Sequence, residues 1–191
     1  MRLALCLLAL CTAAPARAQA VASALWPAAG VAAPVAGGVE GWTGGTGVAA
    51  RLETPLYGGR ARLAVRALRY EASAEGRPPF LLLLPAVGWT RSARLPGGVE
   101  VGAGAAVGAA LFRFGADPSF TGNLQNETEA AVGALARLDV PLGRLVGGRL
   151  ALWAEAEATR VALARPVTLA SVTAGLSVRL DAPGGVQAVL R

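Results

Sequence analysis

The side chains that could carry out acid or base chemistry are carboxylates. The chain has no His, it has no Lys, and its two cysteines are Cys6 and Cys11. This inventory excludes His-assisted hydrolysis, imidazole metal sites and Schiff-base chemistry. Glu155 and Glu157 lie two positions apart, so an extended strand places both on one face, as in a glycosidase carboxylate pair. Arginines are expected on the same face, and we interpret the two acids as partners in structural ion pairs. No catalytic residue, cofactor or metal site is predicted.

Two other motifs do not indicate a site. The glycine-rich stretch at 41–47, GWTGGTG, is followed by no Lys and lies inside a predicted strand, so it is not a phosphate-binding loop. Asn126-Glu127-Thr128 matches a glycosylation acceptor, which has no weight for a bacterial-type exported protein.

The elements that would position these side chains are short strands with a period of two. Small and polar residues alternate with Val, Leu and Ala, which is typical of strands with two unlike faces. Seven runs show this pattern, at 39–53, 59–72, 80–93, 99–114, 127–140, 148–162 and 167–180. A barrel with both ends on one side needs an even number of strands. We predict the eighth at 22–35 despite Pro27 and Pro34, whereas the rival run at 186–191 is too short to span.

A recurring turn motif connects these runs. In residues 136–150, 50–63, 93–99 and 178–186, Arg-Leu ends a run, a Pro interrupts it and Gly-Gly begins the next part of the chain. The other connections are 36–38, 73–79, 115–126 and 163–166. Because 115–126 is the longest and most polar, we predict that its side is external and that the motif turns are internal.

The two faces predict an all-β fold, a closed up-and-down antiparallel transmembrane β-barrel of eight strands. The apolar face runs over about nine to eleven residues, enough for a tilted strand to cross a bilayer. The polar face would fill the lumen with a paired charge network, made of Arg51, Glu53, Arg60, Arg62, Arg66, Glu100, Glu129, Arg137, Asp139, Arg149, Glu155, Glu157 and Arg179. Aromatic residues at the outer strand ends would form an interfacial girdle, made of Trp42, Tyr70, Phe80, Phe112 and Phe114.

The N-terminus has the pattern of an export signal. Arg2 precedes an apolar segment, and Ala16-Arg17-Ala18 is a small-x-small cleavage site. We therefore predict a signal peptide at 1–18, a barrel domain at 19–180 and a C-terminal tail or partial strand at 181–191. The alternative of a lipid-modified Cys11 has the larger Leu10 before it, unlike such sites.

The charge of the chain is +6, and all 18 basic residues are Arg. Both attraction to anionic headgroups and a base-composition bias of the genome account for this usage. No nucleic-acid partner is predicted.

In architecture the chain resembles the small eight-stranded outer-membrane barrels, namely the OmpA-like transmembrane domain and its OmpX and OmpW relatives. The signal peptide, strand alternation, short inner turns and charged lumen carry this resemblance. It implies the cell outer membrane of a Gram-negative-type bacterium and insertion by the assembly machinery for such barrels. Enzymes of this architecture depend on a His, so the resemblance implies no enzyme. Those families end their last strand on an aromatic residue that the assembly machinery reads. Here Leu180 is followed by DAPGGVQAVLR. Either the assembly signal is internal, in AGLSVRL, or the tail completes the sheet.

Three functions fit these observations. The first is a monomeric structural or surface-interaction barrel that contacts outer-membrane lipid, with lipopolysaccharide as a candidate partner. The second is a narrow channel or conduit for small or hydrophobic solutes. The third is a soluble exported barrel that binds a small apolar ligand.

Overall fold

The chain forms one closed antiparallel barrel of eight strands. The computed structural model describes residues 24–36, 39, 41–73, 77–115, 125–145 and 148–181. The strands are β1 (Ala24–Ala36), β2 (Trp42–Leu56), β3 (Gly59–Ala72), β4 (Phe80–Arg94), β5 (Glu100–Phe114), β6 (Glu127–Leu145), β7 (Gly148–Val161) and β8 (Val167–Asp181).

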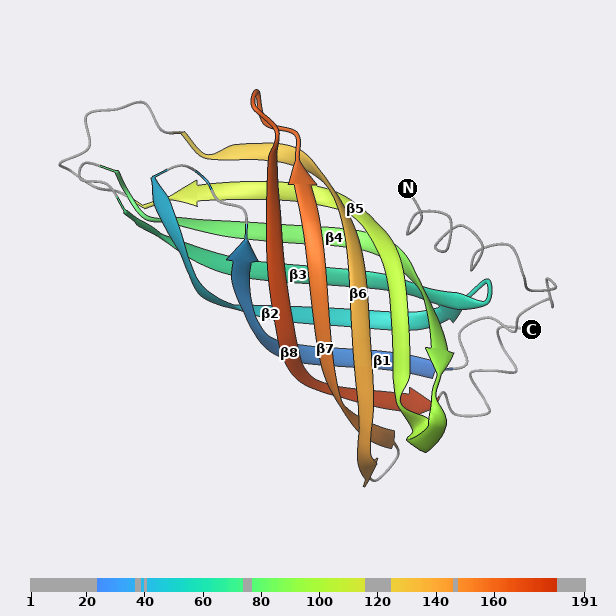
Figure 1. The fold of residues 1–191 in the computed structure, drawn as a ribbon. Coiled ribbons are helices and arrows are strands. Elements are labelled where there is room, and N and C mark those ends of the chain that lie inside the picture. Colours follow the sequence, from blue (N-terminus) through green and yellow to red (C-terminus); the bar gives the residue numbers. More distant parts are fainter. Residues whose placement is uncertain are drawn as a thin grey trace.

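Each strand pairs with its neighbours in the sequence, and β1 pairs with β8 to close the sheet (Figure 1). The predicted fold class is confirmed, and the eighth strand is the run that begins the barrel. We call the end with the connections at 57–58, 95–99 and 146–147 the turn end. The opposite end, with the connections at 37–41, 73–79, 115–126 and 162–166, is the loop end. The predicted signal peptide, the tail beyond 181 and most of the loop at 115–126 lie outside the described residues.

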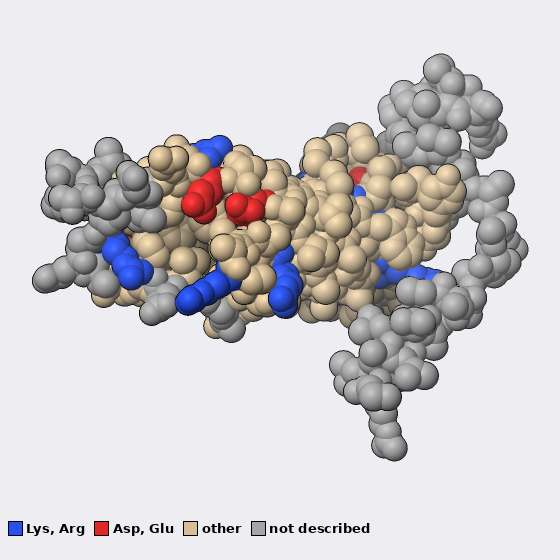
Figure 2. Space-filling model, turned by 90° about the horizontal axis from the view of Figure 1, so that it is seen from above, with Lys and Arg blue, Asp and Glu red and all other residues tan. Residues whose placement is uncertain are grey.

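The alternation of small, polar and apolar residues produces two chemically different faces. In β7 the inward residues from Trp153 to Val161 are all buried, and the residues between them are all exposed. On the outward face of the described strands, charged residues occur only near strand ends, and they are Arg69, Glu71, Arg91, Arg113 and Arg160. Figure 2 shows one side of the molecule, where a wide uncharged area adjoins charged side chains gathered mainly toward one end. The outer surface therefore has an uncharged apolar band.

Two of the turns show why glycine is needed at the turn end. Between β2 and β3, Tyr57 and Gly58 both have positive φ, at 46° and 73°, which is typical of a two-residue hairpin whose twist matches its strands. Between β4 and β5, the 3₁₀ turn η1 (Pro96–Gly98) places Gly97 and Gly98 at φ 77° and 79°. The two reversals lie within the predicted motifs, but the prediction that Pro ends the run is wrong for β2, which continues through Pro55 to Leu56 before the chain reverses at Tyr57 and Gly58.

Three register shifts interrupt the regular pairing, and each adds one residue to one strand of a pair. They lie at Pro34/Ala36, Gly44/Gly47 and Pro141/Gly143. At the second, three steps on β2 match two on β3, because Gly44 pairs with Tyr70 and Gly47 with Leu68. An extra residue reverses the inward and outward positions beyond it. This reversal turns Trp42 inward.

The interior of the barrel is divided into two zones. A hydrophobic cluster fills the half toward the loop end and includes Leu68, Leu82, Phe112 and Leu169. Charged side chains fill the half toward the turn end. Among the described residues, no helix has the length and apolar character needed to cross a membrane.

Candidate functional site: the barrel lumen

A network of ion pairs crosses the lumen between strands that are distant in the sequence. Its arginines come from β2, β3 and β6, and its acids come from β2, β5, β6 and β7. Nine of its side chains belong to buried residues, namely Arg51, Glu53, Arg60, Arg62, Arg66, Arg137, Asp139, Glu155 and Glu157. Period-two alternation places all of them on the inward face, and the barrel curvature brings opposite walls together.

Arg51 lies near the centre of this network. Its guanidinium donates to Asp139 at 3.0 Å and to Glu155 at 3.2 Å. The guanidinium carbon also lies 4.1 Å from the centroid of the Trp153 ring. The ring therefore adds a cation–π contact and covers one face of the buried cation.

The two acids at 155 and 157 serve different arginines. Arg62 makes a two-pronged contact with Glu155, at 2.8 and 3.0 Å to its two oxygens. Glu157 accepts from Arg66, and from the Thr159 hydroxyl at 3.0 Å. Paired, hydrogen-bonded carboxylates of this kind hold charge inside a protein. They are occupied by structural contacts and are poor candidates for acid–base work on a substrate.

The network continues toward the turn end through Glu53 and Glu100. Arg137 contacts both oxygens of Glu53 and donates to Asp139 at 2.8 Å. Arg60 lies 3.5 Å from Glu53 and also contacts Glu100. Glu100 in turn accepts from Arg94 at 2.6 Å.

Five arginines on the inward face balance five acids, and Arg94 adds a sixth, more exposed cation at Glu100. The five arginines 51, 60, 62, 66 and 137 face five acids, Glu53, Glu100, Asp139, Glu155 and Glu157. The other three predicted members differ in their contacts. Glu129 and Arg149 form no ion pair with the residues that the structure describes, and Arg179 stacks on Trp26, with 4.9 Å from its guanidinium carbon to the ring centroid.

The five predicted girdle aromatics face the interior, so the prediction of an outward interfacial girdle is wrong. Tyr70 stacks on Phe80 with ring centroids 4.7 Å apart. Trp42, Phe112 and Phe114 surround the same ring at 5.6, 5.6 and 5.4 Å. Tyr70, Phe80 and Phe112 are buried. Inward positions at the strand ends, together with the register shift at Gly44, place these rings inside, where they close the loop end of the lumen.

Sequence reasoning missed the apolar zone between the aromatics and the charges. Leu82 and Leu84 point inward and are buried with Leu68 and Leu169. The available signal was the run of four leucines at 81–84, which is apolar on both faces. The outward aromatics near the turn end were missed as well. The Trp89 indole donates to the Leu56 carbonyl at 3.0 Å, and Tyr57 is 84% exposed.

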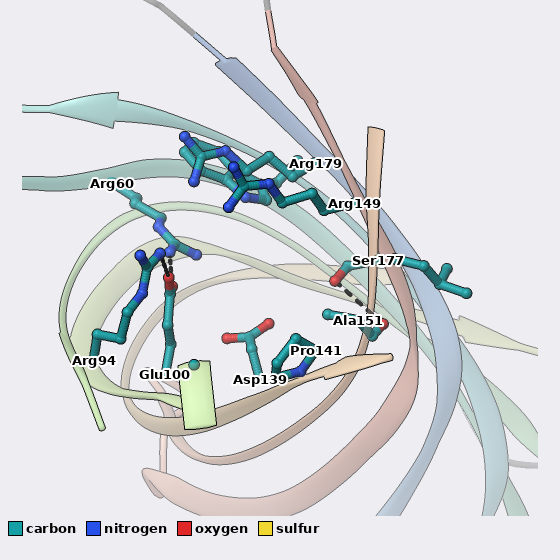
Figure 3. A pocket seen from close by; sticks show the side chains of 12 residues that line it. Arg60, Arg94, Glu100, Asp139, Pro141, Arg149, Ala151, Ser177 and Arg179 are labelled. Carbon is teal, nitrogen blue, oxygen red and sulfur yellow. Dashed lines mark hydrogen bonds and ion pairs between the residues drawn. The ribbon is translucent and has the colours of Figure 1, made fainter. Parts of the chain in front are cut away.

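A cavity of about 170 Å³ opens at the turn end beside the charge network. Its charged lining consists of Arg60, Arg94, Glu100, Asp139, Arg149 and Arg179. Figure 3 shows Arg149 and Arg179 extending side by side, with Arg60 and Glu100 in contact on the other side of the cavity. Among the described residues, no group of three or more His, Cys, Asp or Glu side chains could hold a metal ion.

Comparison with known proteins supports the fold. No family model matches the chain and no curated protein matches it. The crystal structure of Neisserial surface protein A (NspA) is similar, with a TM-score of 0.58 and 11% identity, over 86% of this chain and 100% of that chain. The crystal structure of the outer membrane protein OprG from Pseudomonas aeruginosa gives a TM-score of 0.53 and 10% identity, over 85% of this chain and 98% of that chain. The architectural resemblance to small outer-membrane barrels is confirmed.

Proposed function

We propose that this chain is an outer-membrane barrel with a structural or surface-interaction role and a lumen that is closed to solutes. The support for a membrane position is the uncharged outward band, in which Val31, Val48 and Val107 are 65, 62 and 58% exposed. An apolar surface of this kind favours lipid over water. A closed sheet also satisfies its backbone hydrogen bonds internally, as a membrane-spanning structure must.

The observation that carries the proposal is the filling of the lumen. Buried ion pairs occupy the half toward the turn end, and packed leucines and aromatic rings occupy the half toward the loop end. A solute crossing the barrel would have to displace both. The filled lumen therefore favours the structural role over the channel, and the outward apolar face favours it over the soluble barrel.

The outward charges suggest which lipid groups the barrel meets. Arg69, Arg113 and Arg160 lie near the loop end of the outward face, beyond the uncharged band. At that level of a bilayer they would meet headgroup phosphates, which guanidinium groups bind well. We propose that the loop end faces the outer leaflet and that lipopolysaccharide phosphates are contacts there.

The proposal also includes the route to the membrane. The segment 1–18 would direct export and be removed, and barrel-assembly machinery would insert the remainder. Terminal sequencing of the exported protein should begin at Gln19, whereas a lipid-modified Cys11 would contradict this route.

Fractionation and conductance test the proposed function. The full chain, produced in a Gram-negative host, should remain in the outer membrane after a carbonate wash and should migrate differently on detergent gels with and without boiling. In a planar bilayer it should produce no stable current. Recovery in the detergent-free soluble fraction would favour the soluble barrel, and reproducible single-channel steps would favour the conduit.

A further inference from the structure

The outward face of the barrel is hollowed where β1, β8, β7 and β6 lie next to one another. The hollow has a volume of about 520 Å³, and β6, β7 and β8 run side by side there (Figure 1). Four three-residue segments line it, together with Thr46 of β2, and they are 31–33, 136–138, 154–156 and 172–174. The middle residue of each segment is buried in the lumen. The side chains that shape the hollow are therefore the outward ones on either side of it.

The hollow exists because small side chains occupy its centre. Register places the outward residues in two neighbouring rows that cross four strands. One row consists of Val31, Ala174, Ala154 and Leu138, and the next consists of Ala33, Val172, Ala156 and Ala136. Alanine occupies five of these eight positions, so the larger side chains stand around a low floor.

This hollow is bounded toward the turn end and continues toward the loop end. On the turn side the next row contains Leu152 and Leu176, which are 45 and 51% exposed. On the loop side the next outward residue of β7 is Ala158, which pairs with an alanine on each neighbouring strand. Arg160 follows at the next outward position. Together these residues make a groove with a leucine wall at its inner end and a cation at its mouth.

Arg160 is available to an external partner. It is exposed, and its register partners Val132 and Thr168 carry no charge. It forms no ion pair with any residue that the structure describes. Arg69, at the loop end of β3, differs because it pairs with Glu71.

The distance from the cation to the wall corresponds to one leaflet of a bilayer. Ala154 precedes Arg160 by six positions, which is about 20 Å along a strand. At a strand tilt of about 45° this length gives about 14 Å of depth. One leaflet contributes about 15 Å, half of the hydrocarbon core. An acyl chain whose headgroup lies at Arg160 would therefore end near Leu152.

We propose that this groove binds the acyl chains of lipid A, the phosphorylated glycolipid part of lipopolysaccharide, and that Arg160 contacts one of its phosphates. The inference rests on the proposed function, which places the loop end at the outer leaflet. A guanidinium group complements a phosphate in charge and geometry. Four adjacent strands span about 14 Å, which is broader than one hydrocarbon chain and suits a headgroup that carries several chains.

Two other occupants fit this groove less well. Water is disfavoured because a cavity lined by Ala, Val and Leu offers it few polar partners. A second copy of the chain is disfavoured because a two-fold contact would place the same surface of each copy together. Hollow would then face hollow, and the lining atoms would lose their packing partners.

The test measures lipid retention by the full-length protein, extracted in a non-ionic detergent from the outer membrane of a Gram-negative host. Purified lipid A is added in mixed micelles, and native mass spectrometry counts the bound lipid. We expect saturation at one lipid A per protein. Ala156→Leu should weaken binding at least about tenfold, because the larger side chain fills the groove. Ala67→Leu makes the same change on the outward face of β3 and should bind as the parent does.

A second variant tests the cation separately. Arg160→Gln should also weaken lipid A binding at least about tenfold, because a charge-assisted contact is lost. Arg113→Gln removes the same charge from the loop end of β5 and should leave binding unchanged. Different migration on detergent gels with and without boiling establishes that each variant is folded.

Several outcomes would overturn the inference. They are equal binding by the parent and Ala156→Leu, tighter binding of phosphatidylglycerol than of lipid A, and a dimer that the parent forms and Ala156→Leu does not. A parent that remains in the outer membrane but retains no lipid A would overturn the groove alone. Recovery of the parent in the detergent-free soluble fraction would overturn the proposed function, and the groove with it.

Discussion

At the scale of residues, the interior depends on carboxylates that each contact more than one arginine. Glu155 accepts from Arg51 and Arg62, and Glu53 contacts Arg137 and Arg60. Removing one such acid takes away one partner from two arginines at once and unbalances the charge of the enclosed network. Glu71, by contrast, pairs with Arg69 on the surface, where both side chains are exposed. Removing Glu71 leaves the Arg69 guanidinium solvated by water.

The double variant Glu155→Gln, Glu157→Gln should therefore be strongly destabilised. We expect a loss of about 3 to 5 kcal/mol for each enclosed pair that is broken. The temperature at which the folded band disappears from detergent gels measures this effect. Val132→Thr, an outward change, should lower that temperature much less. Equal temperatures for the double variant and the parent would show that these carboxylates are not part of a closed network.

Phe80→Ala should lower the free energy of unfolding for a different reason. Phe80 contacts four other aromatic rings. Removing a buried ring of this size costs about 3 to 5 kcal/mol. Leu81→Ala, at the adjacent outward position, is the matched control and should cost less. Chemical denaturation of both variants in the same detergent provides the comparison, and similar losses would indicate that the aromatic cluster is not packed.

The sequence allowed the inward face to be predicted but not the contacts made on it. Alternation alone places Arg62 and Glu155 on inward faces, because the side-chain period of a strand is two. That these two residues meet depends on the curvature and stagger of strands 93 positions apart. For the same reason Arg149 was expected in the network although it lies at the mouth.

At the scale of strands, glycine permits a close approach where β1 meets β8. A methyl group added at Gly175 would lie 2.0 Å from the Ala29 carbonyl oxygen, and one added at Gly30 would lie 2.2 Å from that of Ala174. Both contacts are with backbone atoms, which cannot move aside as a flexible side chain could. The strand pair that closes the barrel therefore depends on two residues without a Cβ.

Gly175→Ala should weaken this closure. We expect a clear loss of heat resistance on detergent gels and faster amide exchange in β1 and β8 than in β3 and β4. Gly143→Ala is the control, since a methyl group there would meet no atom within 4 Å. An unchanged exchange rate at β1 and β8 in Gly175→Ala would contradict this assignment.

The register shifts explain why some strand ends could not be predicted. In an uninterrupted strand Trp42 would share the outward face of Val48, because an even number of positions separates them. The extra residue at Gly44/Gly47 reverses the count. Glycine-rich sequence indicates that a shift is possible but does not give its position. The strand bodies, which have no such shift, were predicted correctly, for example β3 and β7.

At the scale of the whole molecule, two different clusters close the lumen, one after the other along the barrel axis. The ion-pair network lies toward the turn end, and the aromatic cluster lies toward the loop end. Ion pairs respond to salt and charge removal, and the aromatic cluster responds to loss of packing. Disrupting the ion-pair network leaves the aromatic cluster in place, and disrupting the aromatic cluster leaves the ion-pair network in place.

Conductance should therefore depend on both seals together. In planar bilayers, Glu155→Gln, Glu157→Gln and Phe80→Ala should each produce no stable current or short-lived current. Their combination should produce frequent openings. Different migration on detergent gels with and without boiling first establishes that each variant is folded. Steady current from the charge variant alone would show that the aromatic cluster does not close the lumen.

The pairing of β1 with β8 also determines the order of events during biogenesis. Ala24 and Asp181 are register partners although 157 positions separate them, so the first strand to emerge from the ribosome obtains its second neighbour only after the last has arrived. Until then the growing sheet has two open edges, each able to pair with another chain. Contacts between such distant residues also form slowly. Protection of a nascent β1 edge is therefore a requirement that this topology places on the cell.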